Sequence, residues 1–424
     1  MSRTRIAPTM AIRVCALLLM GLLMSTTAAC SDSTEDASDS REFTADIHTT
    51  PISDAEFYAA PAVTPRATGV LIRAAAFESS IAHARGWRVM FTSGGLHDGS
   101  PRDIPTMETG IVLLPDSASS DRPIAVWGHP TTGIATACAP SRQKVPDSNI
   151  AGAQQLIDAG WIVAAPDYEG LGIDGLGPHP YLIGESLGRS MLDIVRAAAA
   201  LPEARSSKQF AAYGHSEGGQ AALFAGQHAS RYTPQLELTA VAAMAPSGEL
   251  DLIFRETHTT VTGALLGGFL GSSWSKWYSP AEPGLPSDET FRSESLFDRA
   301  SWQLVERIAA ACSVGEPSVI PLWGQIQTAL NTGTFWRRNP GVDDPWAQKL
   351  AENSAGQEPV DAPVLLTVGS ADDIVSPASV AATEARYRAN GTEVTMRTYA
   401  GGDHMSGVKL ALSEVLDFLR SSAN

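Results

Sequence analysis

The sequence predicts an α/β fold with a mostly parallel central sheet and helices on both of its faces. Two observations support this prediction. Short apolar runs alternate with helix-like segments along most of the chain. Near its middle, the sequence YGHSEGG at residues 213–219 follows an apolar run at 210–213 and precedes a small-residue run at 220–228. A strand, a glycine-bounded turn and a helix are therefore expected there.

The individual elements follow from the same patterns. The first strands succeed one another directly, which predicts an antiparallel edge of the sheet, and later strands alternate with helices. Between them, residues 249–345 are rich in tryptophan, proline and glycine and are expected to form a mostly helical cap inserted into the sheet domain. The expected strands are 69–75, 87–91, 110–114, 123–127, 161–165, 210–213, 237–244, 363–368 and 393–398, and the expected helices are 150–159, 184–200, 220–228, 377–389 and 405–419.

The first 29 residues are interpreted as a signal peptide, because three arginines accompany an apolar stretch at 14–24 that is short for a membrane-spanning helix. Small residues precede Cys30, as in the lipobox of bacterial lipoproteins, so we expect lipidation of Cys30 and a cell-envelope location. Thr27 departs from the usual aliphatic residue, which leaves ordinary secretion as the alternative. Residues 30–60 are expected to form a disordered tether and lead-in, and residues 61–424 the folded domain.

The composition restricts the classes of function. The chain has 424 residues, of which 44% are hydrophobic and 18% charged, as in ordinary globular proteins. Its net charge of −16 and the absence of a basic run argue against nucleic acid as a partner. Besides Cys15 and Cys30 two cysteines remain, so a Cys138–Cys312 disulfide is expected in an exported protein.

Patterns for metal or nucleotide binding are weak or absent. The sequence has no C-x-x-C pair, no H-E-x-x-H and no G-x-x-x-x-G-K-[ST], so no metal site is expected. A G-x-G-x-x-G match at 170–175 is followed by Pro178 and Pro180, where a dinucleotide site requires a helix.

Ser216 lies at the centre of the pattern G-x-S-x-G, between Gly214 and Gly218. A serine on so tight a turn leaves no room for neighbouring β-carbons, and the turn presents its hydroxyl at the carboxyl edge of the sheet. In the context of a strand and a helix, this pattern predicts a nucleophile elbow in an α/β-hydrolase, with Ser216 as the nucleophile.

An acid and a base follow Ser216 in the order that an α/β-hydrolase requires. Asp372 and Asp373 come after the strand at 363–368, and the spacing G-x-x-D-x-x-V from Gly369 favours Asp372, with Asp373 as the alternative. His404 lies in a glycine-flanked loop between the last strand and the last helix. We therefore expect Ser216, Asp372 and His404 to form a catalytic triad.

Two backbone N–H groups are expected to stabilise the oxyanion of the tetrahedral intermediate. One is that of Glu217, the residue after the nucleophile. The other is expected from the loop after the strand at 123–127, where Pro130 has no N–H, so Thr131 is the first choice and Thr132 the second.

Four motifs together resemble the secretory lipase family, which comprises the fungal lipase A group and its actinobacterial relatives. The motifs are WGHPTTG at 127–133, CAPS at 138–141, APDYEGLG at 165–172 and YGHSEGG at 213–219. The resemblance implies an α/β-hydrolase core, a cap after the sixth strand, esterase or triacylglycerol lipase activity and no cofactor. Pro130 departs from the glycine often found in the relatives, and the chain ends about twenty residues after His404, so the long carboxyl-terminal flap of the fungal enzyme is expected to be absent.

The resulting hypothesis is a serine carboxylic-ester hydrolase that acts on small-molecule or lipid esters without an obligate protein partner. An acyltransferase with the same triad is the first alternative, because an alcohol can replace water in the second step. A catalytically silent envelope binding protein is the second alternative.

Overall fold

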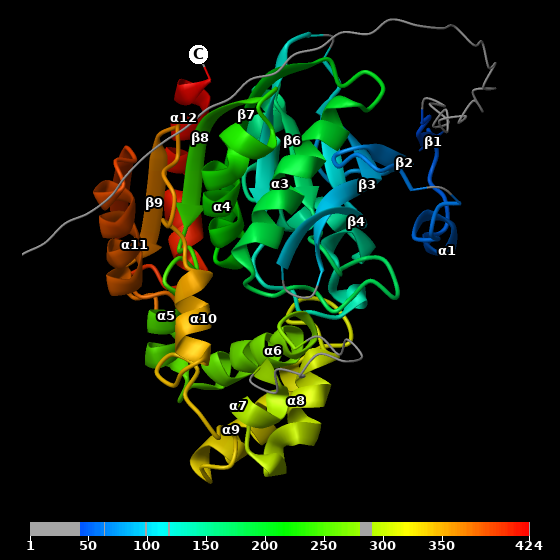
Figure 1. Cartoon of the computed structure of the whole chain (residues 1–424). Helices are drawn as coiled ribbons and strands as arrows, with labels where there is room; N and C mark the ends of the chain where they lie inside the picture. Colours follow the sequence, from blue (N-terminus) through cyan, green and yellow to red (C-terminus); the bar gives the residue numbers. More distant parts are fainter. Residues whose placement is uncertain (1–42, 63, 98–99, 118, 280–290, 424) are drawn as a thin grey trace, which may run out of the picture. The chain divides into compact units, whose positions relative to one another are not determined.

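The computed structural model describes residues 43–62, 64–97, 100–117, 119–279 and 291–423 (Figure 1). The predicted signal peptide, Cys30 and the tether up to residue 42 lie outside these residues. The contacts separate residues 1–43 from residues 44–424, and the second unit contains all of the helices and strands given below. In the part of the chain that is described, no helix is both long and apolar enough to cross a membrane.

Ten strands of the described residues form one sheet, in the order β1-β2-β3-β4-β6-β5-β7-β8-β9-β10. The pairs β2/β3, β3/β4 and β4/β6 are antiparallel, and the other neighbours are parallel, so the predicted antiparallel edge is present. The strands are β1 (Asp46–His48), β2 (Leu71–Phe77), β3 (Ala84–His97), β4 (Ser100–Pro115), β5 (Arg122–Gly128), β6 (Ile162–Pro166), β7 (Ser206–His215), β8 (Glu237–Met244), β9 (Val364–Gly369) and β10 (Val394–Tyr399).

The lead-in contains two elements that its composition does not predict, β1 and the short helix α1 (Asp54–Phe57). Both are held by one side chain of β2. Arg73 donates from Nη1 to the carbonyl oxygens of Glu56, Phe57 and Ala59, at 2.7–3.0 Å, and forms an ion pair with Asp46. Arg73 thus connects β1 and α1 to the sheet, together with the buried rings of Phe57 and Tyr58 and an ion pair between Arg88 and Asp54.

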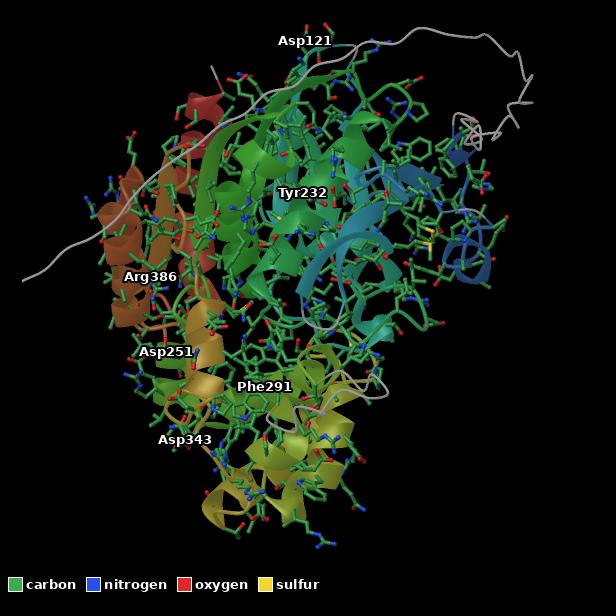
Figure 2. All side chains as sticks on the ribbon, in the orientation of Figure 1. Asp121, Tyr232, Asp251, Phe291, Asp343 and Arg386 are labelled. Carbon is green, nitrogen blue, oxygen red and sulfur yellow. A yellow bond between two sulfur atoms is a disulfide. The ribbon has the colours of Figure 1, made fainter. Side chains whose placement is uncertain are left out.

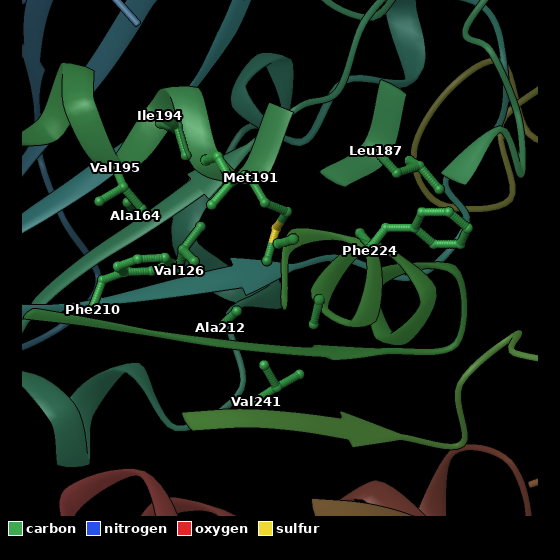
Figure 3. Close-up of a cluster of buried hydrophobic side chains, with 14 of the residues drawn as sticks. Val126, Ala164, Leu187, Met191, Ile194, Val195, Phe210, Ala212, Phe224 and Val241 are labelled. Carbon is green, nitrogen blue, oxygen red and sulfur yellow. The ribbon is translucent and has the colours of Figure 1, made fainter. Parts of the chain in front are cut away.

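Helices cover both faces of the sheet. α3 (Gly184–Ala199), α4 (Glu217–Tyr232) and α11 (Pro377–Ala389) pack on one face, and α2 (Ala153–Asp158) and α12 (Ser406–Ser422) on the other. Because successive side chains of a strand point to opposite faces, alternate residues of each strand join different clusters. On the face shown in Figure 3, α3 and α4 cover a group of strand side chains comprising Val126, Ala164, Phe210, Ala212 and Val241.

The cap follows β8, which is the sixth strand counted from β3. Its helices lie together beyond the carboxyl ends of the parallel strands (Figure 1). They form most of a second hydrophobic cluster, which residues of the sheet domain such as Leu96 and Tyr181 join, and in which the rings of Trp274 and Trp346 stack at 5.8 Å. These helices are α5 (Leu250–Thr257), α6 (Val261–Trp277), α7 (Ser293–Leu296), α8 (Trp302–Ala309), α9 (Trp323–Asn331) and α10 (Trp346–Glu352). Short 3₁₀ turns connect elements at η1 (Thr136–Cys138), η2 (Pro140–Arg142), η3 (Pro146–Asn149), η5 (Arg299–Ser301) and η6 (Ile320–Leu322).

The glycines of α6 allow close packing inside the cap. A β-carbon at Gly267 would lie 2.1 Å from the ring of Trp336, and one at Gly271 would lie 2.5 Å from the ring of Phe297. Both distances are far below van der Waals contact, so these rings lie directly on the helix backbone. Packing therefore accounts for the glycine-rich sequence of this helix.

A disulfide and an ion pair join the cap to the sheet domain. The expected disulfide between Cys138 and Cys312 is present and fully buried, and it links the segment after β5 to the segment after α8. Arg386 of α11, labelled in Figure 2, forms an ion pair with Glu249, the residue before α5.

Candidate active site

The segment around Ser216 has the geometry of a nucleophile elbow. Ser216 lies between β7 and α4 with φ 57° and ψ −118°, a strained conformation for a residue with a side chain. Neighbouring glycines make this turn possible: a β-carbon at Gly214 would lie 2.1 Å from the carbonyl oxygen of Gly218, and one at Gly218 would lie 1.9 Å from that of Gly128. The elbow and the end of β5 therefore touch backbone to backbone.

The three residues expected to form a triad lie in one chain of hydrogen bonds. His404 Nδ1 is 2.8 Å from Asp372 Oδ2, and His404 Nε2 is 3.0 Å from Ser216 Oγ. Because a carboxylate accepts the proton of Nδ1, the lone pair of Nε2 faces the serine hydroxyl. The structure thus brings together residues that follow β7, β9 and β10. Ser216 and His404 are 188 positions apart in the sequence, and Asp372 and His404 are 32 positions apart.

The two candidate acids differ in their surroundings. The Asp372 side chain is completely buried, and its Oδ1 accepts hydrogen bonds from the backbone N–H groups of Ile374 and Val375, at 3.0 and 2.9 Å. Its other oxygen faces His404. Asp373 is exposed and is not the hydrogen-bond partner of His404. The geometry therefore favours Asp372, the first choice from the spacing.

His215 is a neighbour of the site that sequence reasoning missed. Its Nε2 donates to the carbonyl oxygen of His404 at 3.0 Å, and the two rings are tilted with centroids 4.6 Å apart. Burial, reinforced by the charge of His404, lowers the pKa of His215 to about 3, so its ring is neutral at ordinary pH. The only signal in the sequence was its place directly before Ser216.

The expected oxyanion donors come from two segments. Among the described residues, the N–H groups of Thr131, Thr132 and Glu217 have no backbone acceptor. The Thr131 hydroxyl forms a hydrogen bond of 3.0 Å with the Tyr181 hydroxyl, and the buried Thr132 hydroxyl has no partner within the described part of the chain. Thr131 and Thr132 therefore both remain candidates for the second oxyanion donor, as in the prediction from the sequence.

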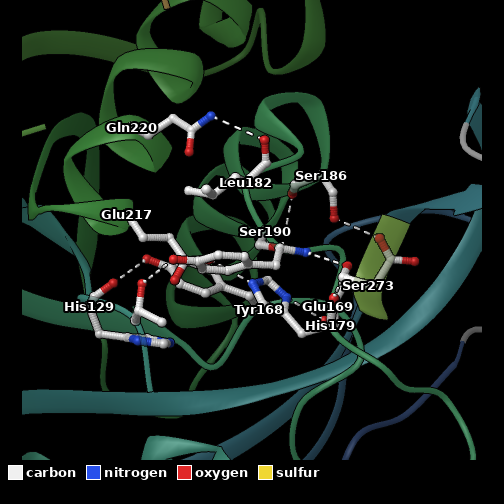
Figure 4. Close-up of polar contacts among 12 residues, drawn as sticks. His129, Tyr168, Glu169, His179, Leu182, Ser186, Ser190, Glu217, Gln220 and Ser273 are labelled. Atoms are coloured by element: carbon white, nitrogen blue, oxygen red, sulfur yellow. Dashed lines mark hydrogen bonds and ion pairs between the residues drawn. The ribbon is translucent and has the colours of Figure 1, made fainter. Parts of the chain in front are cut away.

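The side chain of Glu217 is held inside the protein (Figure 4). Its carboxyl group shares a hydrogen bond of 2.8 Å with His179 Nε2, and the two side chains are only 2% and 1% exposed. The ring of Tyr168 lies stacked between those of His129 and His179, with centroid distances of 4.2 and 5.6 Å. The motif APDYEGLG thus supplies the ring that packs beside the elbow.

The same motif carries two buried acids with structural contacts. Asp167 accepts hydrogen bonds from the backbone N–H of Ser141, at 2.8 Å, and from the Thr109 hydroxyl, at 2.6 Å, which ties the motif CAPS to the sheet. Glu169 accepts from the N–H of Leu96 at 3.0 Å and from the Ser186 hydroxyl at 2.6 Å. Among the described residues, no group of three or more His, Cys, Asp or Glu side chains is arranged to hold a metal ion.

Glu169→Gln is expected to flatten the pH dependence of stability. Burial raises the pKa of Glu169 from 4.5 to about 7. A carboxyl group whose pKa is raised on folding stabilises the protein fully below about pH 4.5, and this contribution is lost as the pH rises towards 7. The loss is on the order of 3 kcal/mol, and an amide of the same shape does not undergo it.

Urea unfolding at pH 5 and pH 8 measures this difference. The fall in unfolding free energy between the two values is expected to be smaller in Glu169→Gln than in the parent chain. Glu256→Gln, at an exposed position of α5, is the matched control and is expected to behave as the parent. An equal fall in all three proteins would contradict the prediction.

A mostly parallel sheet with this strand order, an elbow after β7 and an inserted helical cap define an α/β-hydrolase. Residues 147–421, more than half of the chain, match the secretory lipase family. The chain belongs to this family, as its four motifs predict. It is accordingly an exported carboxylic-ester hydrolase.

Solved structures agree with this fold. Lipase A from Candida antarctica in its closed state has a TM-score of 0.67 at 17% identity, over 88% of this chain and 84% of that one. A ligand-bound form of the rice cell wall degrading esterase LipA from Xanthomonas oryzae has a TM-score of 0.65 at 19% identity, over 82% and 95%. A putative hydrolase from Legionella pneumophila has a TM-score of 0.60 at 18% identity, over 81% and 90%. No curated protein sequence matches the chain.

Proposed function

We propose that this enzyme cleaves carboxylic esters through an acyl-enzyme on Ser216, with His404 as the base and Asp372 as the acid that orients it. One observation carries the proposal: an unbroken set of hydrogen bonds runs from Asp372 through His404 to the Ser216 hydroxyl. Ser216 stands at the tip of a strained elbow, where its oxygen is directed out of the sheet.

The proposed reaction has two steps. Ser216 Oγ attacks the ester carbonyl carbon while His404 Nε2 takes its proton, and Asp372 stabilises the imidazolium that forms. The tetrahedral intermediate expels the alcohol, which receives the proton from His404. Water then attacks the acyl-enzyme in the same way and releases the acid and Ser216.

The negative oxygen of each intermediate is proposed to accept hydrogen bonds from the N–H of Glu217 and from that of Thr131, with Thr132 as the alternative. The fixed carboxyl group of Glu217 supports the first assignment because it prevents the start of α4 from rotating. Donors that are already oriented need no reorganisation during the reaction, which is the main source of their effect.

A fluorophosphonate probe tests the assignment of the nucleophile. We expect one covalent adduct per chain, on the peptide that contains Ser216, with loss of p-nitrophenyl ester hydrolysis in proportion to labelling. An adduct on another residue, or full activity after complete labelling, would overturn the proposal. Addition of acceptor alcohols to the same assay distinguishes a hydrolase, which releases acid, from an acyltransferase, which releases a new ester.

Attachment to a membrane through a lipid on Cys30 is a second part of the proposal. It is supported by the small residues that precede Cys30 and by the polar, acidic stretch that follows it. In a bacterial host, the parent chain is expected to incorporate labelled palmitate and to sediment with membranes. Cys30→Ser is expected to do neither, and equal behaviour of the two chains would contradict the anchor.

A further inference from the structure

One segment of the cap lies against the loop that contains Thr131 and Thr132. The N–H of Ser313 donates to the carbonyl oxygen of Thr132 at 2.9 Å, and the Ser313 hydroxyl donates to that of Thr131. Gly133 and Cys312 form an antiparallel bridge directly beside these bonds. Three consecutive residues of the loop thus pair with the cap through their backbones.

The disulfide fixes this pairing covalently. Cys312 precedes Ser313, and its partner Cys138 lies five residues after Gly133. Both cysteines are fully buried, so the cap segment cannot leave the loop without exposing or breaking the bond. The hydrogen bonds of Ser313 therefore form between two segments that are already held together, which reduces their entropic cost.

A second contact with the loop comes from Tyr181, which lies between β6 and α3 and is itself held by helix α6 of the cap. The Tyr181 hydroxyl lies 3.0 Å from Thr131 Oγ1, and its side chain is 1% exposed. Two residues of α6 hold the backbone of Tyr181: its N–H donates to Ser273 Oγ at 2.9 Å, and its carbonyl accepts from Trp274 Nε1 at 2.9 Å. Phe269 of the same helix packs edge-on against the Tyr181 ring.

Because the peptide bond is planar, a hydrogen bond to the carbonyl oxygen of one residue also fixes the direction of the N–H group of the next residue. In a trans peptide, the carbonyl of one residue and the N–H of the next point in opposite directions. The bond between Ser313 and the Thr131 carbonyl therefore turns the N–H of Thr132 away from the cap segment. His129, which belongs to the sheet domain, acts in the same way on the preceding peptide. Its Nδ1 is 2.8 Å from the Pro130 carbonyl oxygen and so fixes the direction of the Thr131 N–H.

The Thr131 hydroxyl is oriented as well. Burial raises the pKa of Tyr181 well above its usual value, so its hydroxyl remains protonated and is able to donate to Thr131 Oγ1, 3.0 Å away. When Tyr181 donates to Thr131 Oγ1, the hydrogen of Thr131 is available for another acceptor. A developing oxyanion is the acceptor that this site offers during the reaction.

We propose that the cap is a structural part of the oxyanion hole: Ser313 of the cap, and Tyr181, whose backbone the cap helix α6 holds, are positioning residues that keep the donors of Thr131 and Thr132 in place. This inference rests on the proposed function. It assigns to the cap a role in the chemical step itself, beyond covering the substrate. The predicted signature is a loss in kcat rather than in KM, because the donors act on the transition state and not on the bound ester.

Two variants test the proposal in the full-length protein, with p-nitrophenyl butyrate as substrate. Tyr181→Phe removes one hydroxyl and is expected to lower kcat by about 10-fold, below the 10²–10³-fold effect of losing a whole donor. Ser313→Ala is expected to lower kcat by about 3-fold, since Ser313 is exposed and keeps its backbone bond. Ser313→Thr retains the hydroxyl and is expected to restore kcat.

Matched controls separate positioning from general destabilisation of the cap. Ser301 donates to the Thr334 carbonyl inside the cap, and the hydroxyl of Tyr278 accepts from Asn353 Nδ2. Ser301→Ala and Tyr278→Phe remove the same groups as the test variants, and both are expected to keep the parent kcat. Thermal unfolding of all five variants gives the loss of stability with which each kcat is compared.

The affinity for a transition-state analogue provides the decisive readout. A trifluoromethyl ketone forms an oxyanion on the active serine, so its inhibition constant is expected to rise in Tyr181→Phe and Ser313→Ala by the same factor as kcat/KM falls. Unchanged kcat and inhibition constants in both variants would overturn the role of the cap while leaving the nucleophile untouched. Activity retained by Ser216→Ala would instead overturn the proposed function.

Discussion

Ser216→Ala is expected to lower kcat for p-nitrophenyl esters by a factor on the order of 10⁴–10⁶. Without the hydroxyl there is no group to carry the acyl chain, and His404 has no proton to take. The activity that remains comes from the oxyanion donors and from substrate binding alone. Initial rates at saturating ester concentration measure this loss. The parent chain is diluted until its rate equals that of the variant, and the dilution factor gives the ratio of the two kcat values.

The fold of Ser216→Ala is expected to be intact. The substitution removes one oxygen at a site where φ is positive, and alanine tolerates that backbone no worse than serine. Ser247→Ala, at a buried position whose backbone N–H donates to the Ser216 carbonyl oxygen, is the matched control. If Ser216→Ala retains a substantial part of the parent kcat while its thermal unfolding is unchanged, Ser216 is not the nucleophile.

Asp372→Asn is expected to lower kcat by about 10⁴-fold, because it forces His404 into the wrong tautomer. Oδ1 of Asp372 accepts from the N–H groups of Ile374 and Val375, so the amide oxygen of asparagine must occupy that position. The amide NH₂ then faces His404 Nδ1. A donor at that place requires a lone pair on Nδ1 and moves the ring proton to Nε2, where the base must accept the proton of Ser216.

Asp373→Asn is the matched control, because it makes the same chemical change one residue later, at an exposed side chain. Its kcat is expected to stay within about twofold of the parent value, since exposed charges act weakly through solvent. Equal losses in the two variants, or a larger loss in Asp373→Asn, would mean that the acid had been assigned to the wrong residue.

Local patterns predicted most elements of the core. The strand at 237–244 and the helix at 377–389 have the expected bounds, because each is delimited by clear turn or capping signals, such as Ser376 and Pro377 at the start of α11. The hairpin β3–β4 is much longer than its apolar centres at 87–91 and 110–114. Its outer part contains glycine and proline, and the pairing of the two strands, rather than their composition, extends it.

The candidate site divides in the same way. Ser216, Asp372 and His404 were found because each carries a short signal at the end of a strand, and parallel strands bring their carboxyl ends to one edge of the sheet. For His215, the only signal in the sequence was its position within the motif YGHSEGG. Tyr181 and Ser313 had no signal at all, because their partners lie 50 and 182 residues away in the sequence.

The sequence by itself determined the fold class, the order of the site residues and the disulfide pairing, since periodicity, turn chemistry and cysteine count are local or countable properties. Only the tertiary structure decided which aspartate faces His404, how Arg73 contacts the lead-in and how the cap meets the loop at 131–133. Those outcomes depend on hydrogen bonds between distant segments, whose geometry arises only when the packed sheet and cap bring the segments together.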